Sequence, residues 1–404
     1  MTFKPADNLQ DLNYSDDHKG VNPAITDSST FTFDTAKDML DTFEGKSDGL
    51  YLYSRHTSPS GQFLADALAA MEGSEAAHVA GSGMGAITPV LLQLCNSGDE
   101  IIASRTIYGG THAFLENFIP KFGIKTTFVA PTDLSAIENA ITKNTKVIYV
   151  EILSNPLLEV ANIPEISKIA KKNNITLVVD NTFTPMVFSP IKLGADVVVY
   201  SLTKYINGAS DAVGGAICGT ADFINSLKDV NDGASMLLGP VLDPLRAASI
   251  TKNMRTLHIR MQQHSRNAKY VSSKLQELGV EISYPGLESH PQHDLMISMK
   301  NNGFGYSGMF TIDAGTLDKA NKLMEAMQRD NIGLLAVSLG FYKTLFSAPG
   351  TSTSSEITDE EQNEIGISKG LVRFSIGLDH DIERTFQKIK TCMEEVKILE
   401  VKNA

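Results

Sequence analysis

The residues with the clearest chemical potential are a lysine and an aspartate that each follow a short apolar run. Lys204 comes just after the apolar run 196–200, and Asp180 ends an earlier run. A lysine at the end of a buried strand loses its proton readily, which suits it to condensation with a carbonyl group. The hydroxyl groups of Ser201 and Thr203 can hold a phosphate. Together these residues predict a pyridoxal phosphate (PLP) site: Lys204 for the aldehyde, Asp180 for the pyridinium nitrogen, and the two hydroxyls for the phosphate.

A glycine-rich turn at 81–86 matches the pattern G-x-G-x-x-A of dinucleotide-binding proteins. That pattern expects an acidic residue at the end of the next strand, whereas Asp99 and Glu100 stand at its beginning. A helix N-terminus presents free backbone N–H groups that bind any phosphate. We therefore interpret the turn as a cradle for one cofactor phosphate on the amides of Gly83 and Met84. A tight strand-to-helix turn and a nicotinamide dehydrogenase are the alternatives.

Three further side chains are candidates for contact with a cofactor or substrate. Tyr108 follows the next strand, where its ring can stack on a flat cofactor and its phenol can carry a proton, unless it is simply half-buried. Arg55, in Tyr53-Ser54-Arg55, suits a phosphate, although an exposed surface position is the commoner fate of arginine. Arg373 lies inside an apolar strand, so it needs an anionic partner, either a substrate carboxylate or a structural ion pair.

The elements that must position these residues alternate between strand and helix from about residue 65. Unbroken apolar strands in such alternation mean a mainly parallel sheet with helices on both faces. Ligands of such sheets bind beyond the carboxyl ends of the strands, where Asp180, Ser201 and Lys204 fall. We expect strands at 76–80, 100–103, 126–130, 147–150, 176–179, 197–200 and 215–218, and helices at 63–72, 86–94, 111–122, 134–140 and 163–173.

The length of 404 residues predicts two domains and an arm. Residues 1–55 are polar and weakly periodic, which is typical of an arm that packs on another body. Residues 56–245 form the expected large domain, and residues 246–404 a smaller α+β domain with a linking helix. In the smaller domain we expect a helical run at 245–278, strands near 296–299, 308–312 and 371–376, and helices at 317–329 and 381–399.

Charge and composition exclude several classes of partner. The net charge of −12 argues against nucleic acid and anionic membranes, which attract clustered Lys and Arg. The sequence shows neither a membrane-spanning apolar run nor the layout of a secretory signal. Cys95, Cys218 and Cys392 are widely spaced and odd in number, which favours reduced thiols in a cytoplasmic protein. His290 and His293 have no third ligand near them, so we expect no metal site.

With these residues in view, the chain resembles the Cys/Met-metabolism family of PLP-dependent enzymes from about residue 20 to the C-terminus. This family includes methionine γ-lyase, cystathionine γ-synthase, the cystathionine lyases and O-acylhomoserine sulfhydrylase. The implied fold is that of PLP fold type I, the aspartate-aminotransferase-like α/β fold, with a mostly parallel seven-stranded sheet. The motifs that carry the resemblance are Tyr53-Ser-Arg55, Ser82-Gly-Met84, Tyr108-Gly-Gly-Thr111, Asp180-Asn-Thr182, Ser201-Leu-Thr-Lys204-Tyr205, Ser210-Asp211 with Gly214-Gly215, and Gly370-Leu-Val-Arg373.

The resemblance also implies roles for individual residues. Lys204, Tyr108 and Asp180 are the implied catalytic residues, with Tyr108 stacked on the cofactor ring. The substrate α-carboxylate is bound by Arg373, with Ser338 near it. The other implied cofactor-binding residues are Gly83, Met84, Asn155, Ser201 and Thr203, joined by Tyr53, Ser54 and Arg55 from a neighbouring subunit. The implied assembly is therefore a homotetramer, a dimer of dimers with shared active sites.

Two segments look most like the plant-type methionine γ-lyases: 284–293 and the Ser/Thr-rich run 352–356. Gly110 stands where many bacterial methionine γ-lyases carry cysteine, but the plant-type lyases look similar to this chain there. The resemblance therefore favours γ-elimination of L-methionine or a related sulfur amino acid to 2-oxobutanoate, ammonia and methanethiol. The alternatives are γ-replacement on O-acetyl- or O-succinylhomoserine and cleavage of cystathionine, since the same residues serve each reaction.

Overall fold

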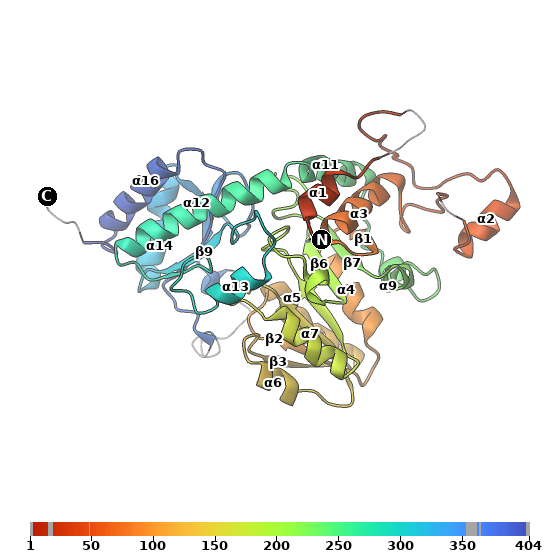
Figure 1. Ribbon diagram of the computed structural model, residues 1–404, viewed down its shortest axis with the longest axis horizontal. Helices are drawn as coiled ribbons and strands as arrows, with labels where there is room; N and C mark the ends of the chain where they lie inside the picture. Colours follow the sequence, from red (N-terminus) through yellow and green to blue (C-terminus); the bar gives the residue numbers. More distant parts are fainter. Residues whose placement is uncertain (1–2, 15–18, 48, 353–361, 363–364, 401–404) are drawn as a thin grey trace.

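The computed structural model describes residues 3–14, 19–47, 49–352, 362 and 365–400. The Ser/Thr-rich run 352–356 lies outside the described residues except for Ser352. The chain forms a large lobe and a small lobe that lie side by side, with an extension that projects from the large lobe (Figure 1). Two helices, α11 (Pro244–Met254) and α12 (Leu257–Glu277), connect the lobes.

The large lobe is built on a seven-stranded sheet, which confirms the predicted fold class. Only β7 runs antiparallel to its neighbours, so the sheet is mostly parallel. Each predicted strand is present within about two residues at either end. The order across the sheet is β1 (Ala76–Ala80), β7 (Gly215–Gly219), β6 (Val197–Ser201), β5 (Thr176–Asp180), β4 (Thr145–Glu151), β2 (Glu100–Ser104) and β3 (Lys125–Val129).

Helices cover both faces of this sheet, because neighbouring strand residues point to opposite sides and both sides are apolar. Ile148 contributes to the core under α3 (Pro59–Glu72) and α7 (Ile163–Lys172), while Tyr149 contributes to the core under α4 (Gly83–Leu94). The shorter helices of this lobe are α5 (Gly109–Ala113), α6 (Leu134–Asn139), α8 (Pro190–Leu193), α9 (Ala221–Leu227) and α10 (Ala234–Leu238).

The small lobe has its own five-stranded sheet and its own apolar core. It matches the α+β organisation expected for the C-terminal part of the chain. The sheet order is β10 (Gly333–Leu335), β11 (Thr344–Ser347), β12 (Leu371–Ser375), β9 (Met309–Asp313) and β8 (Ile282–Ser283). The helices packed on it are α12, α14 (Leu317–Arg329) and α16 (Ile382–Glu395).

Three local expectations differ from the structure. The strand expected at 296–299 is wrong, because α13 (His293–Met299) buries Met296 and Met299 at helical spacing. The helical run at 245–278 is divided between α11 and α12. The helix expected at 111–122 consists of α5, a π-helical turn and a 3₁₀ turn, since Pro120 cannot continue a regular α-helix.

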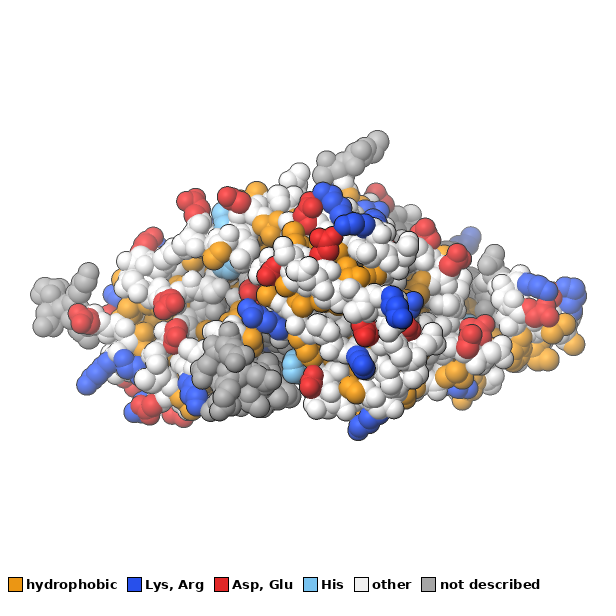
Figure 2. All heavy atoms as spheres, turned by 90° about the horizontal axis from the view of Figure 1, so that it is seen from below, with side chains coloured by type: hydrophobic (Ala, Val, Ile, Leu, Met, Phe, Trp, Pro, Cys, Tyr) orange, Lys and Arg blue, Asp and Glu red, His pale blue; other side chains and the backbone are white. Residues whose placement is uncertain are grey.

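The N-terminal segment has two distinct parts. Helix α1 (Pro5–Gln10) packs on α3 of the same chain. The following segment projects from the body and carries α2 (Ala36–Phe43), whose Met39, Leu40 and Phe43 are exposed (Figure 1). Figure 2 shows apolar side chains gathered at this end of the molecule. In the described residues no helix is both long enough and apolar enough to cross a membrane.

Candidate active site

A cavity of about 240 Å³ lies at the carboxyl ends of the central strands of the large sheet and is closed by residues of the small lobe. This is the position that the strand-end rule predicts for a ligand. Most of the predicted site residues line it, from five separate segments of the large lobe and one strand of the small lobe: Gly83, Met84, Tyr108, Asn155, Asp180, Ser201, Thr203, Lys204 and Arg373.

Lys204 lies in the turn after β6 and contacts the small lobe. Its Nζ donates a hydrogen bond to Ser338 Oγ at 3.2 Å. Burial lowers the pKa of the Lys204 amine to about 8, and the nearby positive charge of Arg373 acts in the same direction. Gly340 permits this contact: its φ is +78°, and a Cβ there would lie 2.6 Å from the backbone nitrogen of Tyr205. The result is an amine that reaches its neutral, nucleophilic form near pH 8.

Asp180 is the last residue of β5, and each of its two carboxyl oxygens accepts a hydrogen bond that orients the group. Its Oδ1 accepts a hydrogen bond from the Thr182 amide at 2.9 Å, and its Oδ2 accepts one from the Tyr149 hydroxyl at 3.3 Å. Burial raises the pKa of Asp180, while the hydrogen bonds from Thr182 and Tyr149 oppose that rise. A cation beside this carboxyl would favour its ionised form.

The N-terminus of α4 makes a cradle that suits a phosphate. Ser82 caps the helix by accepting a hydrogen bond from the Gly85 amide at 2.9 Å, and the amides of Gly83 and Met84 have no intrahelical acceptor. A Cβ on Gly83 would lie 2.9 Å from the Cβ of Ser201. The absence of a side chain at Gly83 therefore brings the first turn of α4 against the end of β6, where Ser201 stands.

Arg373 is a buried cation at the small-lobe side of the cavity. It is 3% exposed, and its Nη1 donates a hydrogen bond to Asn155 Oδ1 at 2.8 Å. Within the described residues it forms no ion pair. Burial lowers the pKa of the Arg373 guanidinium to about 10, while Tyr205 and Glu151 oppose this change. A buried guanidinium without a carboxylate partner provides a site for an anionic ligand.

The chain matches known proteins along almost its whole length. The model of the Cys/Met metabolism PLP-dependent enzyme family matches residues 8–391. The chain belongs to this family. A methionine γ-lyase of Arabidopsis thaliana is 44% identical over 380 residues, which cover 93% of this chain and 86% of that protein. An O-succinylhomoserine sulfhydrylase of Pseudomonas aeruginosa is 36% identical over 359 residues, covering 88% and 87% of the two chains.

Solved structures agree with the fold. One from Campylobacter jejuni, described as an O-acetylhomoserine (thiol)-lyase, superposes with a TM-score of 0.89 and is 30% identical, covering 97% of this chain and all of that one. It contains a pyridoxyl-lysine phosphate adduct. These comparisons confirm the resemblance, the type I fold and the use of PLP by this enzyme. The donor set of the cavity fits PLP: a lysine of lowered pKa, a buried carboxyl group, and helix N–H groups beside a serine.

Sequence reasoning missed several residues that line the cavity of this PLP-dependent enzyme. The most polar of them is Glu151, the last residue of β4, which pairs in register with Asp180. A signal was present, because Glu151 ends an apolar strand just as Asp180 does. The others are Ile87, Leu153, Phe183, Val213, Val337 and Leu339. Ser82 and Thr182 also line the cavity; the sequence placed them in the motifs of the family resemblance but gave them no role.

Tyr53, Ser54 and Arg55 do not line this cavity within one chain. The Arg55 guanidinium lies 5.8 Å from the ring centroid of Tyr53, and its Nη1 donates to the carbonyl oxygen of Met236 at 3.4 Å. Tyr53 itself is 45% exposed. In a single subunit these residues are therefore placed on the surface near α10 rather than at the PLP cradle.

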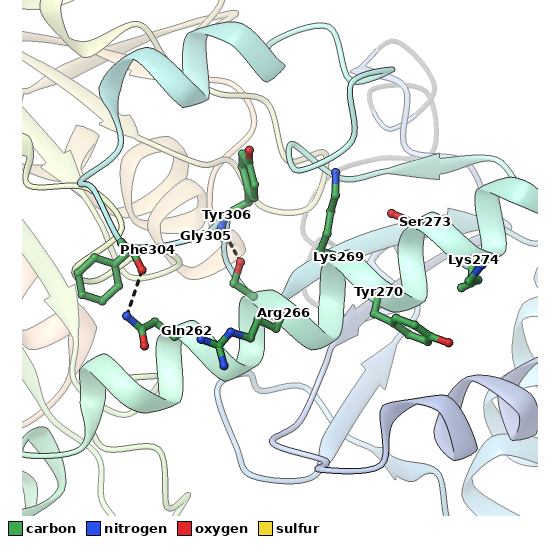
Figure 3. Close-up of a pocket in the computed structure, with 11 residues that line it drawn as sticks. Gln262, Arg266, Lys269, Tyr270, Ser273, Lys274, Phe304, Gly305 and Tyr306 are labelled. Atoms are coloured by element: carbon green, nitrogen blue, oxygen red, sulfur yellow. Dashed lines mark hydrogen bonds between the residues drawn. The ribbon is translucent and has the colours of Figure 1, made fainter.

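A larger hollow of about 610 Å³ lies along α12, away from the PLP site. In Figure 3, Lys269 and Tyr306 point to one side of α12 and Tyr270 to the other. The cations that line it are Arg266, Lys269 and Lys274, and its lining contains neither a carboxyl group nor a predicted site residue. The chemistry of the lining, rather than the size of the cavity, therefore distinguishes the candidate active site.

Proposed function

We propose that this enzyme catalyses the γ-elimination of L-methionine or a closely related sulfur amino acid. One methionine and one water would give 2-oxobutanoate, ammonia and methanethiol. The observation that carries the proposal is a single cavity that combines the low-pKa amine of Lys204 with the buried guanidinium of Arg373, which forms no ion pair among the described residues. The similarity to the Arabidopsis methionine γ-lyase supports the choice of substrate.

The proposed cofactor site follows the donor set of the cavity. Bound PLP supplies an aldehyde that condenses with amines and a ring that accepts electrons from Cα of the substrate. Lys204 would hold the aldehyde carbon, and Asp180 the ring nitrogen, whose positive charge keeps this carboxyl ionised. Tyr108 would stack on the ring. The proposed phosphate-binding groups are the amides of Gly83 and Met84 and the hydroxyls of Ser201 and Thr203.

The proposed proton transfers use two residues. Arg373 binds the substrate carboxylate and so presents Cα to Lys204, which removes the Cα proton. Lys204 must release that proton, to the cofactor or to solvent, before its neutral amine can remove a Cβ proton. Tyr108 donates a proton to the sulfur as the Cγ–S bond breaks, so that methanethiol leaves as a neutral thiol. Lys204 suits the first two transfers because its pKa of about 8 allows it to accept and release a proton near neutrality.

The apolar part of the cavity lining favours an uncharged substituent at Cγ. Ile87, Phe183, Val213, Val337 and Leu339 offer no charged partner, which suits a methylthio group better than the second amino-acid end of cystathionine. The alternative functions are γ-replacement on O-acetyl- or O-succinylhomoserine and cystathionine cleavage. The similarity to a sulfhydrylase keeps γ-replacement as the second candidate.

We also propose a homotetramer in which paired subunits complete each other's sites. Tyr53, Ser54 and Arg55 lie outside their own cavity, and α2 exposes a cluster of apolar side chains, as expected of surfaces that pack on another subunit. The proposed division into 1–55, 56–245 and 246–404 is supported by the separate core of the small lobe. Three free thiols support the cytoplasm as the proposed compartment.

The test is a product assay on the purified, PLP-loaded enzyme. Methionine, cystathionine, and O-acetylhomoserine with sulfide are supplied separately, and keto acid, methanethiol and new amino acids are measured. We expect 2-oxobutanoate and methanethiol in equal amounts from methionine. Homocysteine formation that far outpaces methionine cleavage would instead identify a sulfhydrylase. Lys204→Ala should abolish turnover and the visible absorbance of the bound cofactor, whereas Lys274→Ala, on α12, should preserve both.

A further inference from the structure

Glu151 is a buried acidic residue of the cavity with two well-defined hydrogen bonds. Its Oε1 accepts a hydrogen bond from the backbone amide of Tyr108 at 2.7 Å, and its Oε2 accepts one from the backbone amide of Asn155 at 2.9 Å. Tyr108 belongs to the loop after β2, and Asn155 to the loop after β4. One carboxyl group therefore joins the two loops that carry these site residues.

Through Asn155, Glu151 is connected to Arg373, the residue proposed to bind the substrate carboxylate. The side chain of Asn155 accepts the hydrogen bond from Arg373, so Glu151, Asn155 and Arg373 form a continuous chain from β4 to β12. Tyr108 is the N-cap residue of α5, and its side chain makes no capping hydrogen bond. The bond from its backbone amide to Glu151 therefore holds the backbone of this residue in place beside the cavity. Asn155 and Glu151 are buried, and a buried N–H group without its acceptor is costly.

We propose that Glu151 is a positioning residue that sets the carboxylate-binding pocket of this enzyme by holding Asn155, and with it Arg373, in place. The proposal rests on the proposed function, in which Arg373 binds the substrate carboxylate.

The carboxyl group suits this task because it offers two acceptor atoms in one plane. A glutamine offers one acceptor, and its NH₂ group would face a backbone N–H donor from either Tyr108 or Asn155. Burial raises the pKa of Glu151 well above its usual range and the charge of Asp180 adds to this, while the hydrogen bonds from the amides of Tyr108 and Asn155 oppose the rise.

The experiment compares two small amines that differ in one group. Glycine carries the α-carboxylate and has no side chain to eliminate, whereas methylamine has only the amine. Their binding to the PLP-loaded enzyme is followed by the change in visible cofactor absorbance. We expect Glu151→Gln to weaken glycine binding by about tenfold, the equivalent of one lost buried hydrogen-bond acceptor, and to change methylamine binding by less than about twofold.

The matched control is Glu159→Gln. Glu159 also joins the loops after β2 and β4, through a 2.7 Å bond from the Thr106 hydroxyl, but it does not line the cavity. Its substitution should leave both amines unaffected. Equal weakening of glycine and methylamine by Glu151→Gln, or no weakening of glycine, would overturn the proposal.

Two further measurements keep the proposal separate from protein folding and from the proposed function. If Glu151→Gln does not fold, Glu151→Asp, which keeps two acceptors on a shorter side chain, should still show a loss specific to glycine, and an equal loss of both amines refutes the proposal. For methionine, the variant should raise KM more than it lowers kcat. A parent enzyme that shows no cofactor absorbance, or binds glycine no better than methylamine, would refute the proposed function itself.

Discussion

Replacing Arg373 with methionine should weaken substrate binding without lowering the stability of the folded enzyme. The guanidinium is buried, and in the described residues it has no carboxylate partner. Its pKa falls to about 10, and since a change of one in pKa corresponds to about 1.4 kcal/mol, the buried charge costs the folded protein roughly 3 kcal/mol. Methionine removes this cost and fills similar space. It also leaves Asn155 Oδ1 without its donor, which costs about 1–2 kcal/mol. The cofactor-free variant should therefore be at least as stable as the parent, by up to roughly 2 kcal/mol.

The same substitution should strongly weaken substrate binding. Truncating one side of a buried charge pair costs about 2–5 kcal/mol, so binding of the substrate carboxylate should fall by a factor of roughly 30 to several thousand. Glycine binding should show this loss in the visible absorbance of the cofactor, while methylamine binding, which uses no carboxylate contact, should remain nearly unchanged.

The assay pairs these titrations with urea unfolding of the cofactor-free protein, because bound cofactor would add its own stabilisation. Arg266→Met is the matched control: Arg266 is exposed on α12 and lies away from the site, so its loss should affect neither measurement. The reasoning is refuted if Arg373→Met destabilises the protein by more than about 2 kcal/mol, because the charge would then have a stabilising partner in the folded state. Unchanged glycine binding would refute the role of Arg373 in substrate recognition.

Three further predictions concern the cofactor-free protein. Burial lowers the pKa of Lys204 to about 8, so the free energy of unfolding should rise between about pH 8 and 10.5, and urea unfolding of Lys204→Met should show a smaller rise. Burial raises the pKa of Glu72 to about 8, so between about pH 4.5 and 8 the folded chain keeps a proton that the unfolded chain releases. The free energy of unfolding should therefore fall as the pH rises through this range, and Glu72→Gln should make that fall smaller in urea unfolding. Gly340→Ala should lower the thermal unfolding midpoint more than Gly315→Ala: both glycines have φ near +80°, but only at Gly340 would a Cβ collide with backbone.

The large sheet could be predicted from sequence because its strands are apolar on both faces and are separated by regular helical spacers. Where a segment is short and apolar, periodicity alone does not distinguish a strand from a helix, and this caused the error at 296–299. The packing of α1 on α3 was also beyond sequence reasoning, since Ala6 and Leu9 form too short an apolar stripe to indicate what covers it.

The prediction of the site residues depended on the rule that ligands of a parallel sheet bind at the carboxyl ends of its strands. Lys204 and Asp180 both follow apolar runs, so their convergence was expected from a parallel sheet. Ser338 came only from the family resemblance, because nothing in its local sequence shows that a loop of the other lobe reaches Lys204. Glu151 was overlooked although it ends a strand too. The phosphate-binding role predicted for Arg55 requires a second subunit, so the geometry of one chain does not test it.

The position of Lys204 depends on the small lobe as much as on the strand that precedes it. Arg260, near the start of α12, donates hydrogen bonds to the carbonyl oxygens of Tyr205 and Ile206, the two residues after Lys204, and also to that of Asn253 near the end of α11. The break between α11 and α12 therefore lies at the lysine turn. From the other side, Gly340 brings its loop against the backbone of Tyr205. The linking helices and the small lobe thus fix the turn on two sides, so the large sheet alone does not determine where the amine of Lys204 points.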